Sequence, residues 1–205
     1  MQYSIVNLSE IKYKSEGLFI LSPDFFSKDN YDCLDKLNDS NCVLLDFFEP
    51  NKKTIKKIEE KSINYDLTNS LGNFLENGEL IDKINCEKIS LEEGSFIISR
   101  LRSYLMEFAI VEKKHFKQIA STEYLSYFPK NENVFSSELL LVFTKTKYVQ
   151  RILKNSQYGT EHPRFYDFVF DKIPINSKIL RLNQKVKELI RYCFKLRQSA
   201  DTLYK

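Results

Sequence analysis

Basic side chains recur through the second half of this chain at spacings that suit a polyanionic ligand. Arg100 and Arg102 lie two residues apart after the apolar run Phe96–Ser99, so an extended backbone sends both guanidinium groups from the same face. The planar fork of arginine can bind two phosphate oxygens or read the O6 and N7 atoms of guanine. The other candidate nucleic-acid contacts carry ammonium, guanidinium, imidazole or hydroxyl groups: Lys113, Lys114, Lys117, Thr122, Lys145, Lys147, Arg151, Lys154, Thr160, His162 and Arg164.

Each of these candidates also has a purely structural interpretation. Arg100 or Arg102 could form an internal salt bridge with Glu92, Glu93 or Glu107. The lysines could be solvated surface charges that bind phosphates without reading bases. The segment 159–164 is a loop by composition and could be no more than a turn. These alternatives stay open at the level of the sequence.

Residues that would make the chain an enzyme are scarce. No glycine-rich cofactor loop is present, and neither Asn-Pro-Pro-aromatic nor Asp-Pro-Pro-aromatic, the tetrapeptides of amino-methyltransferases, occurs. Asp46 followed by Glu59-Glu60-Lys61 loosely matches a metal-dependent nuclease motif, in which two carboxylates hold Mg²⁺ beside a lysine. Such motifs normally lie on strands, whereas Lys52–Lys61 reads as a short helix or a loop. We therefore expect a non-catalytic chain with no metal site or cofactor of its own.

The elements that would position the basic residues follow from the apolar pattern. Residues 3–50 alternate apolar runs, interpreted as strands at Tyr3–Leu8, Gly17–Leu21 and Cys42–Phe48, with a short helix near Asn30–Leu37. Further strands are predicted at Phe96–Ile98, Phe108–Val111 and Tyr124–Phe128. Two helices follow, over Ser136–Thr144 and around Val149–Leu153; the second has Lys147, Arg151 and Lys154 on its polar side.

The last thirty residues predict one long helix. Apolar side chains recur there at alternating spacings of three and four, without an internal Gly or Pro, which is typical of a coiled-coil seam. A single amphipathic helix packed on its own domain is the alternative. The predicted seam consists of Ile179, Leu182, Val186, Leu189, Cys193, Leu196, Ala200 and Leu203.

Charge is distributed unevenly along the chain. Residues 1–99 hold 11 Lys/Arg and 18 Asp/Glu, residues 100–175 hold 12 and 8, and residues 176–205 hold 8 and 2. The acidic first half and basic second half are compatible with a polyanion lying along the C-terminal two thirds.

Four segments, in order, resemble the target-recognition domain of the DNA specificity (S) subunits of type I restriction–modification systems. They are Gly94–Leu105, Ala120–Tyr124, Gly159–Phe165 and Lys172–Ile175, the last just before the terminal helix. The sequence departs from the family at that junction, where Ile173-Pro174-Ile175-Asn176 replaces a proline-rich segment containing Glu-Gln.

The resemblance implies a mixed α/β (α+β) target-recognition domain over residues 1–175, followed by a long dimerisation and spacer helix over 176–205. It implies a half-length S subunit that binds double-stranded DNA and directs a partner adenine methyltransferase (M) subunit, which would hold S-adenosylmethionine, to a bipartite site. Such a chain would form a homodimer through its helix. A truncated or regulatory fragment that recognises no site productively is the alternative.

Composition places the chain among globular proteins, with 42% hydrophobic and 29% charged residues. No apolar run approaches the roughly 18 residues of a membrane span, and the N-terminus lacks the order of a signal peptide. Cys33, Cys42, Cys86 and Cys193 form no CxxC pair, so reduced thiols are expected. We expect a cytoplasmic protein with no membrane partner.

Overall fold

A four-stranded antiparallel sheet lies at the centre of the molecule. The computed structural model describes residues 5–18 and 20–203. All four residues of the central strand β6 are buried, which explains the continuous apolar run in the sequence. Phe96 and Ile98 of this strand contribute to one hydrophobic core, whereas Ile97 contributes to a second. The strand order is β1 (Phe48–Asn51), β9 (Tyr124–Pro129), β6 (Phe96–Ser99) and β7 (Phe108–Ile110).

A second, five-stranded sheet packs against the Ile97 side of the central sheet. The shared core contains Ile97 and Ala109 from the central sheet and Tyr65, Ile89 and Ala120 from the second. Strands β3 and β8 run parallel to each other, and the other pairs are antiparallel. The order is β2 (Thr54–Ile55), β5 (Lys88–Leu91), β8 (Lys117–Ser121), β3 (Ser62–Tyr65) and β4 (Glu79–Ile81), with the short helix η1 (Leu67–Ser70) after β3.

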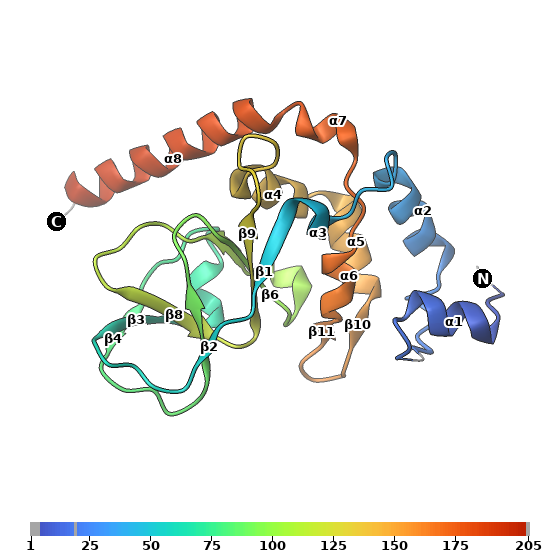
Figure 1. Cartoon of the computed structure of the whole chain (residues 1–205), viewed down its shortest axis with the longest axis horizontal. Coiled ribbons are helices and arrows are strands. Elements are labelled where there is room, and N and C mark those ends of the chain that lie inside the picture. The colour runs from blue at the N-terminus through green and yellow to red at the C-terminus, as the bar shows by residue number, and fades with distance from the viewer. Residues whose placement is uncertain (1–4, 19, 204–205) are drawn as a thin grey trace.

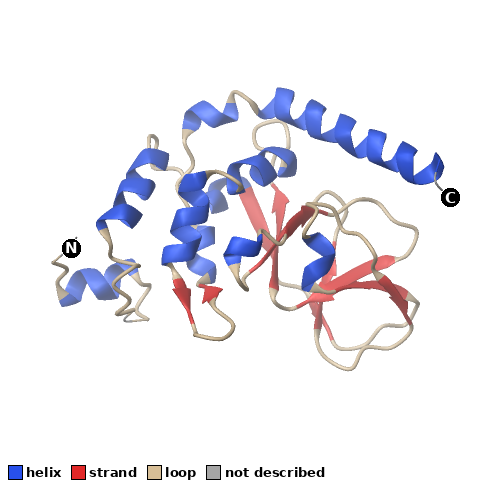
Figure 2. Ribbon diagram, turned by 180° about the vertical axis from the view of Figure 1, so that it is seen from behind, coloured by secondary structure: helices blue, strands red, loops and turns tan. Residues whose placement is uncertain are grey.

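Four helices cover the other side of the central sheet, so that they and the second sheet lie at opposite ends of the molecule, with the C-terminal helix running over the sheets (Figure 2). Phe170 of α6 is fully buried, and its ring lies near those of Phe96, Tyr127 and Phe165. The expected mixed α/β fold is confirmed. These helices are α2 (Lys28–Leu37), α4 (Ser137–Thr144), α5 (Lys147–Asn155) and α6 (Asp167–Asp171), and the hairpin of β10 (Gln157–Tyr158) and β11 (Arg164–Phe165) connects α5 to α6.

The structure corrects the prediction for the N-terminal fifty residues. Helix α1 (Leu8–Lys14) begins where a strand was expected to end, because Asn7 and Glu10 form a reciprocal capping box. The predicted strand Cys42–Phe48 contains helix α3 (Leu44–Phe47), in which Asp46 accepts a hydrogen bond from the Val43 N–H. Residues 3–4 of the first predicted strand lie outside the described residues. The predicted strand Gly17–Leu21 is also wrong: Gly17, with a φ of 81°, ends α1 in a turn, and the other described residues of the segment are not in a strand. The strands predicted from Phe96 onward, the short helix near Asn30–Leu37 and the two helices after Ser136 are confirmed.

The C-terminal helix begins later than predicted. A short helix, α7 (Ser177–Leu180), comes first, and the long helix α8 (Asn183–Leu203) follows a turn at residues 181–182. The Asn183 side chain explains this start, because it bonds to the backbone of the loop before α4, accepting from Ser136 N at 2.9 Å and donating to Glu132 O. Helix α8 then extends across the sheets to the end opposite α1 (Figure 1).

One side of α8 packs on the domain from which it emerges. Val186, Ile190 and Phe194 lie against the main core, and Ile179 of α7 does the same. Charged contacts flank this apolar side: Arg191 Nε lies 2.6 Å from Glu138 Oε1, and Arg197 pairs with Glu76 and Glu112. Two residues of the predicted seam, Ile179 and Val186, are thus partly covered by their own domain.

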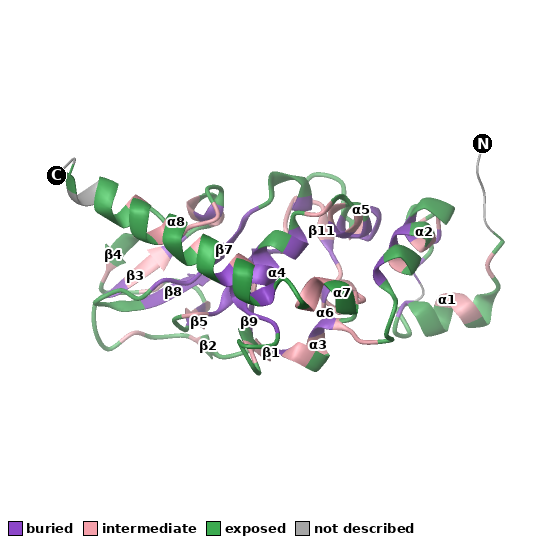
Figure 3. Cartoon of the chain, turned by 90° about the horizontal axis from the view of Figure 1, so that it is seen from above, coloured by how far each residue is buried: buried purple, intermediate pink, exposed green. Residues whose placement is uncertain are grey.

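The other six seam residues are exposed: Leu182, Leu189, Cys193, Leu196, Ala200 and Leu203. Four of them are leucines seven residues apart, Leu182, Leu189, Leu196 and Leu203, which we call the leucine stripe. Each leucine of this stripe is at least half exposed, and the outward side of α8 is exposed along its length (Figure 3). None of the described helices is long and apolar enough to cross a bilayer.

Candidate nucleic-acid interface

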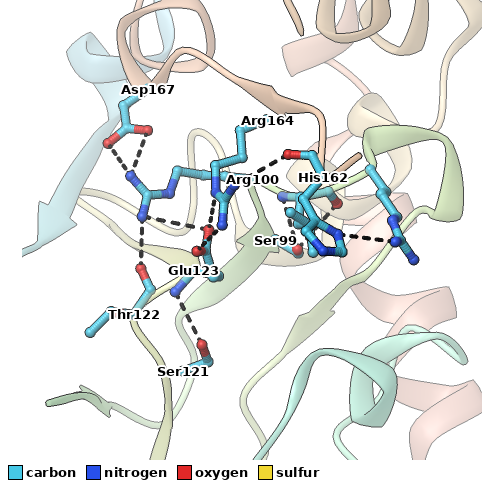
Figure 4. A network of polar contacts seen from close by, with 10 residues as sticks. Ser99, Arg100, Ser121, Thr122, Glu123, His162, Arg164 and Asp167 are labelled. Atoms are coloured by element: carbon cyan, nitrogen blue, oxygen red, sulfur yellow. Dashed lines mark hydrogen bonds and ion pairs between the residues drawn. The ribbon is translucent and has the colours of Figure 1, made fainter. Parts of the chain in front are cut away.

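Three chain segments meet at a salt-bridged group of side chains centred on Glu123. Arg164 of β11 donates to both Glu123 oxygens, from Nε at 2.9 Å and from NH2 at 2.7 Å (Figure 4). Arg100, which follows β6, has its NH2 3.8 Å from Glu123 Oε2 and donates from it to Thr122 O at 3.0 Å. Backbone bonds hold the three segments together: Arg100 N donates to Glu123 O, and Phe165 N donates to Arg100 O. We call Arg100, Arg102 and Arg164, with the neighbouring His162 and Thr122, the arginine cluster.

The charges of this group stabilise one another. The hydrogen bonds from Arg164, with the nearby charge of Arg100, hold the pKa of the Glu123 carboxyl below its usual value. Glu123 in turn raises the pKa of Arg164. Arg100 NH1 also lies 3.3 Å from Asp167 Oδ1 of α6. Arg100 and Arg164 therefore have internal carboxylate partners, which are Glu123 and Asp167 rather than the three glutamates considered from the sequence.

Arg102 differs from its two neighbours. Its NH2 lies 3.1 Å from His162 Nδ1, and its backbone N–H donates to Pro163 O at 2.7 Å. Within residues 5–18 and 20–203, no carboxylate forms an ion pair with Arg102. The guanidinium fork of Arg102 is therefore the one in the cluster that is available to a phosphate or a base edge without first losing a carboxylate.

Helix α5 places further basic side chains beside the 159–163 loop. Val149, Ile152 and Leu153 are buried, as predicted, and Lys147, Arg151 and Lys154 are exposed on the opposite side. Arg151 and Lys154 line a shallow pocket with Gly159 and Pro163 of that loop, and Arg151 pairs with Asp29 at 3.3 Å. Thr160 and His162 are exposed in the same loop, and Lys145 is exposed at the end of α4.

The lysines before β8 lie away from the arginine cluster. Lys113 and Lys114 are exposed in the connection from β7 to β8, and Lys117 is the first residue of β8. Thr122 follows the last residue of the same strand. Five residues at about 3.3 Å per residue separate the two ends by roughly 16 Å. The predicted basic residues therefore form two surfaces, the arginine cluster and a lysine loop (residues 113–117), joined by strand β8.

Sequence reasoning missed the acidic side chains of α6. Asp167, Asp171 and Tyr127 line a cavity of about 360 Å³ next to Arg100 and Thr122. The Tyr127 hydroxyl donates to Asp171 Oδ1 at 2.6 Å, and burial raises the pKa of both groups. The one available signal was that Asp167 and Asp171 are four residues apart beside the Gly159–Phe165 segment, which places them on one side of a helical turn.

The nuclease-like residues do not come together. The Asp46 carboxylate caps α3, whereas Glu59 and Glu60 are exposed in the loop between β2 and β3 of the second sheet. Across the described ranges, no three His, Cys, Asp or Glu side chains are grouped so that they could hold a metal ion.

A buried carboxyl beneath the cluster predicts a pH-dependent stability. Glu107 is 6% exposed, its Oε2 has no hydrogen-bond partner among the described residues, and burial raises its pKa. When the pKa of a carboxyl is higher in the folded than in the unfolded protein, the protonated carboxyl stabilises the fold. That stabilisation is fully present below the unfolded-state pKa and is lost as the pH rises through the folded-state pKa. Glu107→Gln should therefore raise the free energy of unfolding at pH 7–8, by the order of 1 kcal/mol, and have little effect near pH 4. Urea denaturation at several pH values measures this.

The exposed Glu161→Gln is the matched control and should show no such dependence. An effect of Glu107→Gln that is the same at pH 4 and pH 8 would contradict the role given to burial of the charge.

Two solved structures are among those that share this fold, whereas no family model and no curated protein matches the chain. The first comes from a structure titled for the complex assembly and conformational transition of the type I R-M system. It is 18% identical, with a TM-score of 0.56, over 79% of this chain and 44% of that chain. The second is the HsdS subunit from Thermoanaerobacter tengcongensis, also 18% identical, with a TM-score of 0.53, over 77% of this chain and 43% of that chain.

The chain thus spans less than half the length of the solved structures that it matches. Both matches cover more than three quarters of this chain, so they include most of its elements rather than one motif. The resemblance stated from the sequence is confirmed at the level of the fold: this chain is folded like part of an HsdS subunit of a type I restriction–modification system.

Proposed function

We propose that this chain is a non-catalytic DNA-recognition subunit of a type I restriction–modification complex. The observation that carries the proposal is the partly exposed arginine cluster, in which Arg102 has no carboxylate partner among the described residues, on a fold shared with an HsdS subunit. The proposed partners are double-stranded DNA and a methyltransferase subunit, which would supply S-adenosylmethionine and the methylation chemistry. The DNA site would be bipartite.

The two basic surfaces would contribute to DNA recognition in different ways. Lysines of the lysine loop and α5 supply phosphate affinity that depends on salt but not on sequence. Arg102 is free to bind a base edge or a phosphate. Arg100 and Arg164 would act differently, because a DNA group must compete with Glu123 for their guanidinium groups. That competition favours a ligand whose geometry suits the fork, which adds selectivity at a cost in affinity.

We expect Arg102→Ala to weaken binding to a preferred duplex by about 1–3 kcal/mol if it reads a base. The duplex is first selected from random sequences with the partner methyltransferase present. Lys114→Ala and Lys147→Ala should instead weaken all duplexes similarly and reduce the salt slope by about one unit. Fluorescence anisotropy at several salt concentrations measures both effects.

Arg100→Ala and Arg164→Ala should also weaken binding, with some loss of fold stability because the first removes the guanidinium partner of Asp167 and the second removes the nearer of the two guanidinium partners of Glu123. Thermal melting separates the two effects. Unchanged duplex binding by all five folded variants would move the DNA interface elsewhere. Mg²⁺-dependent nicking by the purified chain, abolished by Glu59→Ala, would favour the nuclease function instead.

The leucine stripe supports a second part of the proposal, self-association through α8. Three leucines of the stripe lie on α8 and the fourth, Leu182, in the turn before it, and each is at least half exposed. The domain already covers a different side of α8 with Val186, Ile190 and Phe194. Eight basic residues in 176–205 disfavour a parallel pair, which would align like charges. We therefore propose an antiparallel homodimer with a recognition domain at each end and inverted half-sites on the DNA. A methyltransferase or a second specificity chain is the alternative partner for this stripe.

A further inference from the structure

A strained turn lies inside the arginine cluster, in the connection from β6 to β7. The helix η2 (Ser103–Leu105) is flanked by Arg102, with φ 48° and ψ 59°, and Met106, with φ 53° and ψ 41°. Both residues carry a Cβ atom and adopt the left-handed backbone region that residues other than glycine rarely occupy. Such strain persists only where the surrounding structure imposes it, and it concentrates at ligand-binding sites.

Several bonds fix this turn in one conformation. Arg102 N donates to Pro163 O at 2.7 Å, and Leu105 N donates to Arg102 O at 2.8 Å. Gln157 Nε2 donates to Ser103 Oγ at 2.9 Å, which connects the turn to β10, directly after α5. The turn is therefore preorganised, so a ligand would not have to supply the free energy of ordering it.

The fixed turn presents apolar side chains to solvent. Tyr104, Leu105 and Met106 are 58%, 38% and 39% exposed, while the residues on either side, Ser103 and Glu107, are buried. Three consecutive exposed apolar residues on a rigid tip leave apolar surface in contact with water. A partner that covers these three side chains would remove their apolar surface from water, which favours binding.

The surroundings indicate what kind of partner this is. Arg102 belongs to the turn itself and His162 contacts Arg102, while Gln157 of β10, the strand that follows the basic helix α5, bonds to Ser103 of the turn. Of the nearby carboxylates, Glu107 is buried and Glu123 is paired with Arg164, which leaves Glu161 exposed. A tip that is apolar in the middle and basic around it matches a duplex, in which phosphates lie outside and stacked bases lie inside.

We infer that the tip formed by Tyr104, Leu105 and Met106 enters the base stack of the bound duplex at one step. Small apolar side chains, leucine and methionine among them, act as such wedges in other DNA-binding proteins, and an aromatic ring can stack on an unstacked base. Insertion is easiest at flexible pyrimidine–purine steps, so the tip also adds sequence preference without hydrogen bonds to bases. The inference rests on the proposed DNA-binding function and goes beyond it.

The test uses the full chain and a selected duplex in which 2-aminopurine replaces one base at a time. Binding of the wild-type chain should raise the fluorescence at one step. Leu105→Ala and Tyr104→Ala should abolish that rise and lower affinity by about tenfold, the effect of losing roughly one stacked base, with an unchanged salt slope. Leu80→Ala is the matched control, because Leu80 is 46% exposed on β4 of the second sheet.

Met106→Gly provides a variant in which misfolding is not a concern, since glycine favours the positive φ that Met106 adopts. It should melt no lower than the wild type and still reduce the fluorescence rise.

If Arg102→Ala weakens binding while Tyr104→Ala, Leu105→Ala and Met106→Gly leave fluorescence and affinity unchanged, the inferred insertion of the tip is wrong and the proposed DNA recognition stands. If no duplex is bound by the wild-type chain with its methyltransferase, the proposed function fails as well. Binding of the tip to anionic lipid vesicles instead of DNA, lost in Leu105→Ala, would also overturn the wedge.

Discussion

Replacing Leu189 and Leu196 together with aspartate is expected to convert a dimer of this chain into a monomer. Both side chains are about half exposed and lie on the side of α8 that its own domain does not cover. Burying a leucine stabilises an interface by about 2 kcal/mol, so four substituted positions in the dimer remove several kcal/mol. Several kcal/mol correspond to a loss of affinity of a thousandfold or more. Sedimentation over a range of concentrations measures the change.

The same helix provides a control with the same change in charge. Gln184 and Ser199 are exposed and polar, and Gln184→Asp with Ser199→Asp should leave the dimer intact. The aspartate pair in the leucine stripe should also abolish pairing of half-sites on DNA while each recognition domain still binds weakly. If the wild-type chain sediments as a monomer at high concentration, self-association is excluded, and the leucine stripe is left for a methyltransferase or a second specificity chain.

Phe170→Ala is expected to lower the free energy of unfolding by about 3–5 kcal/mol, the usual cost of removing a buried phenyl ring. Phe170 is fully buried where α6 meets the central sheet, with its ring 5.3 Å from that of Tyr127 and 6.2 Å from that of Phe96. The loss is a large part of the stability of a typical domain. Urea denaturation followed by circular dichroism measures it.

This substitution should also weaken DNA binding, because α6 carries Asp167, which pairs with Arg100. Phe128→Ala is the control: Phe128 lies on β9 but is 42% exposed, so its removal should cost well under 2 kcal/mol. Equal losses from the two variants would mean that Phe170 does not hold α6 against the sheet.

Local sequence patterns predicted those helices and strands whose conformation depends mainly on their own residues. Strand β6 is a continuous apolar run, and α5 has apolar and basic residues on opposite sides. Helices α1 and α3 were misread because short apolar runs fit a strand as well as a helix, and side-chain caps at Asn7 and Asp46 decided the outcome. The apolar pattern alone does not show that a side-chain cap favours a helix over a strand.

The contacts of the arginine cluster could not be predicted in the same way. Glu123 and Arg164 are 41 residues apart, and Arg100 and Asp167 are 67 apart. Which carboxylate meets which arginine depends on how β8, β9 and β11 are placed, and no periodicity in the sequence contains that information. The sequence named the three arginines as candidate contacts, and all three are partly exposed, but it could not show that two of them are paired internally.

The C-terminal helix shows a second limit of prediction from the sequence. Spacings of three and four identify an apolar side but do not say what covers it. Here Val186 belongs to the intramolecular contact, while Leu182, Leu189 and Leu196 remain exposed. The domain covers the adjacent side with Ile190 and Phe194, which are outside the strict seven-residue repeat.

The separation of the two basic surfaces by strand β8 has a mechanical consequence. Ile97 of β6 packs against β8 and its sheet, whereas Phe96 and Ile98 of the same strand belong to the other core, so packed elements connect the lysine loop with the arginine cluster. A duplex that touches one surface holds the other at a fixed distance and a high effective concentration. In the proposed DNA complex, the two surfaces would bind one duplex together, although each contact would be weak alone. A duplex that bends away from either surface would lose far more affinity than the single contact contributes.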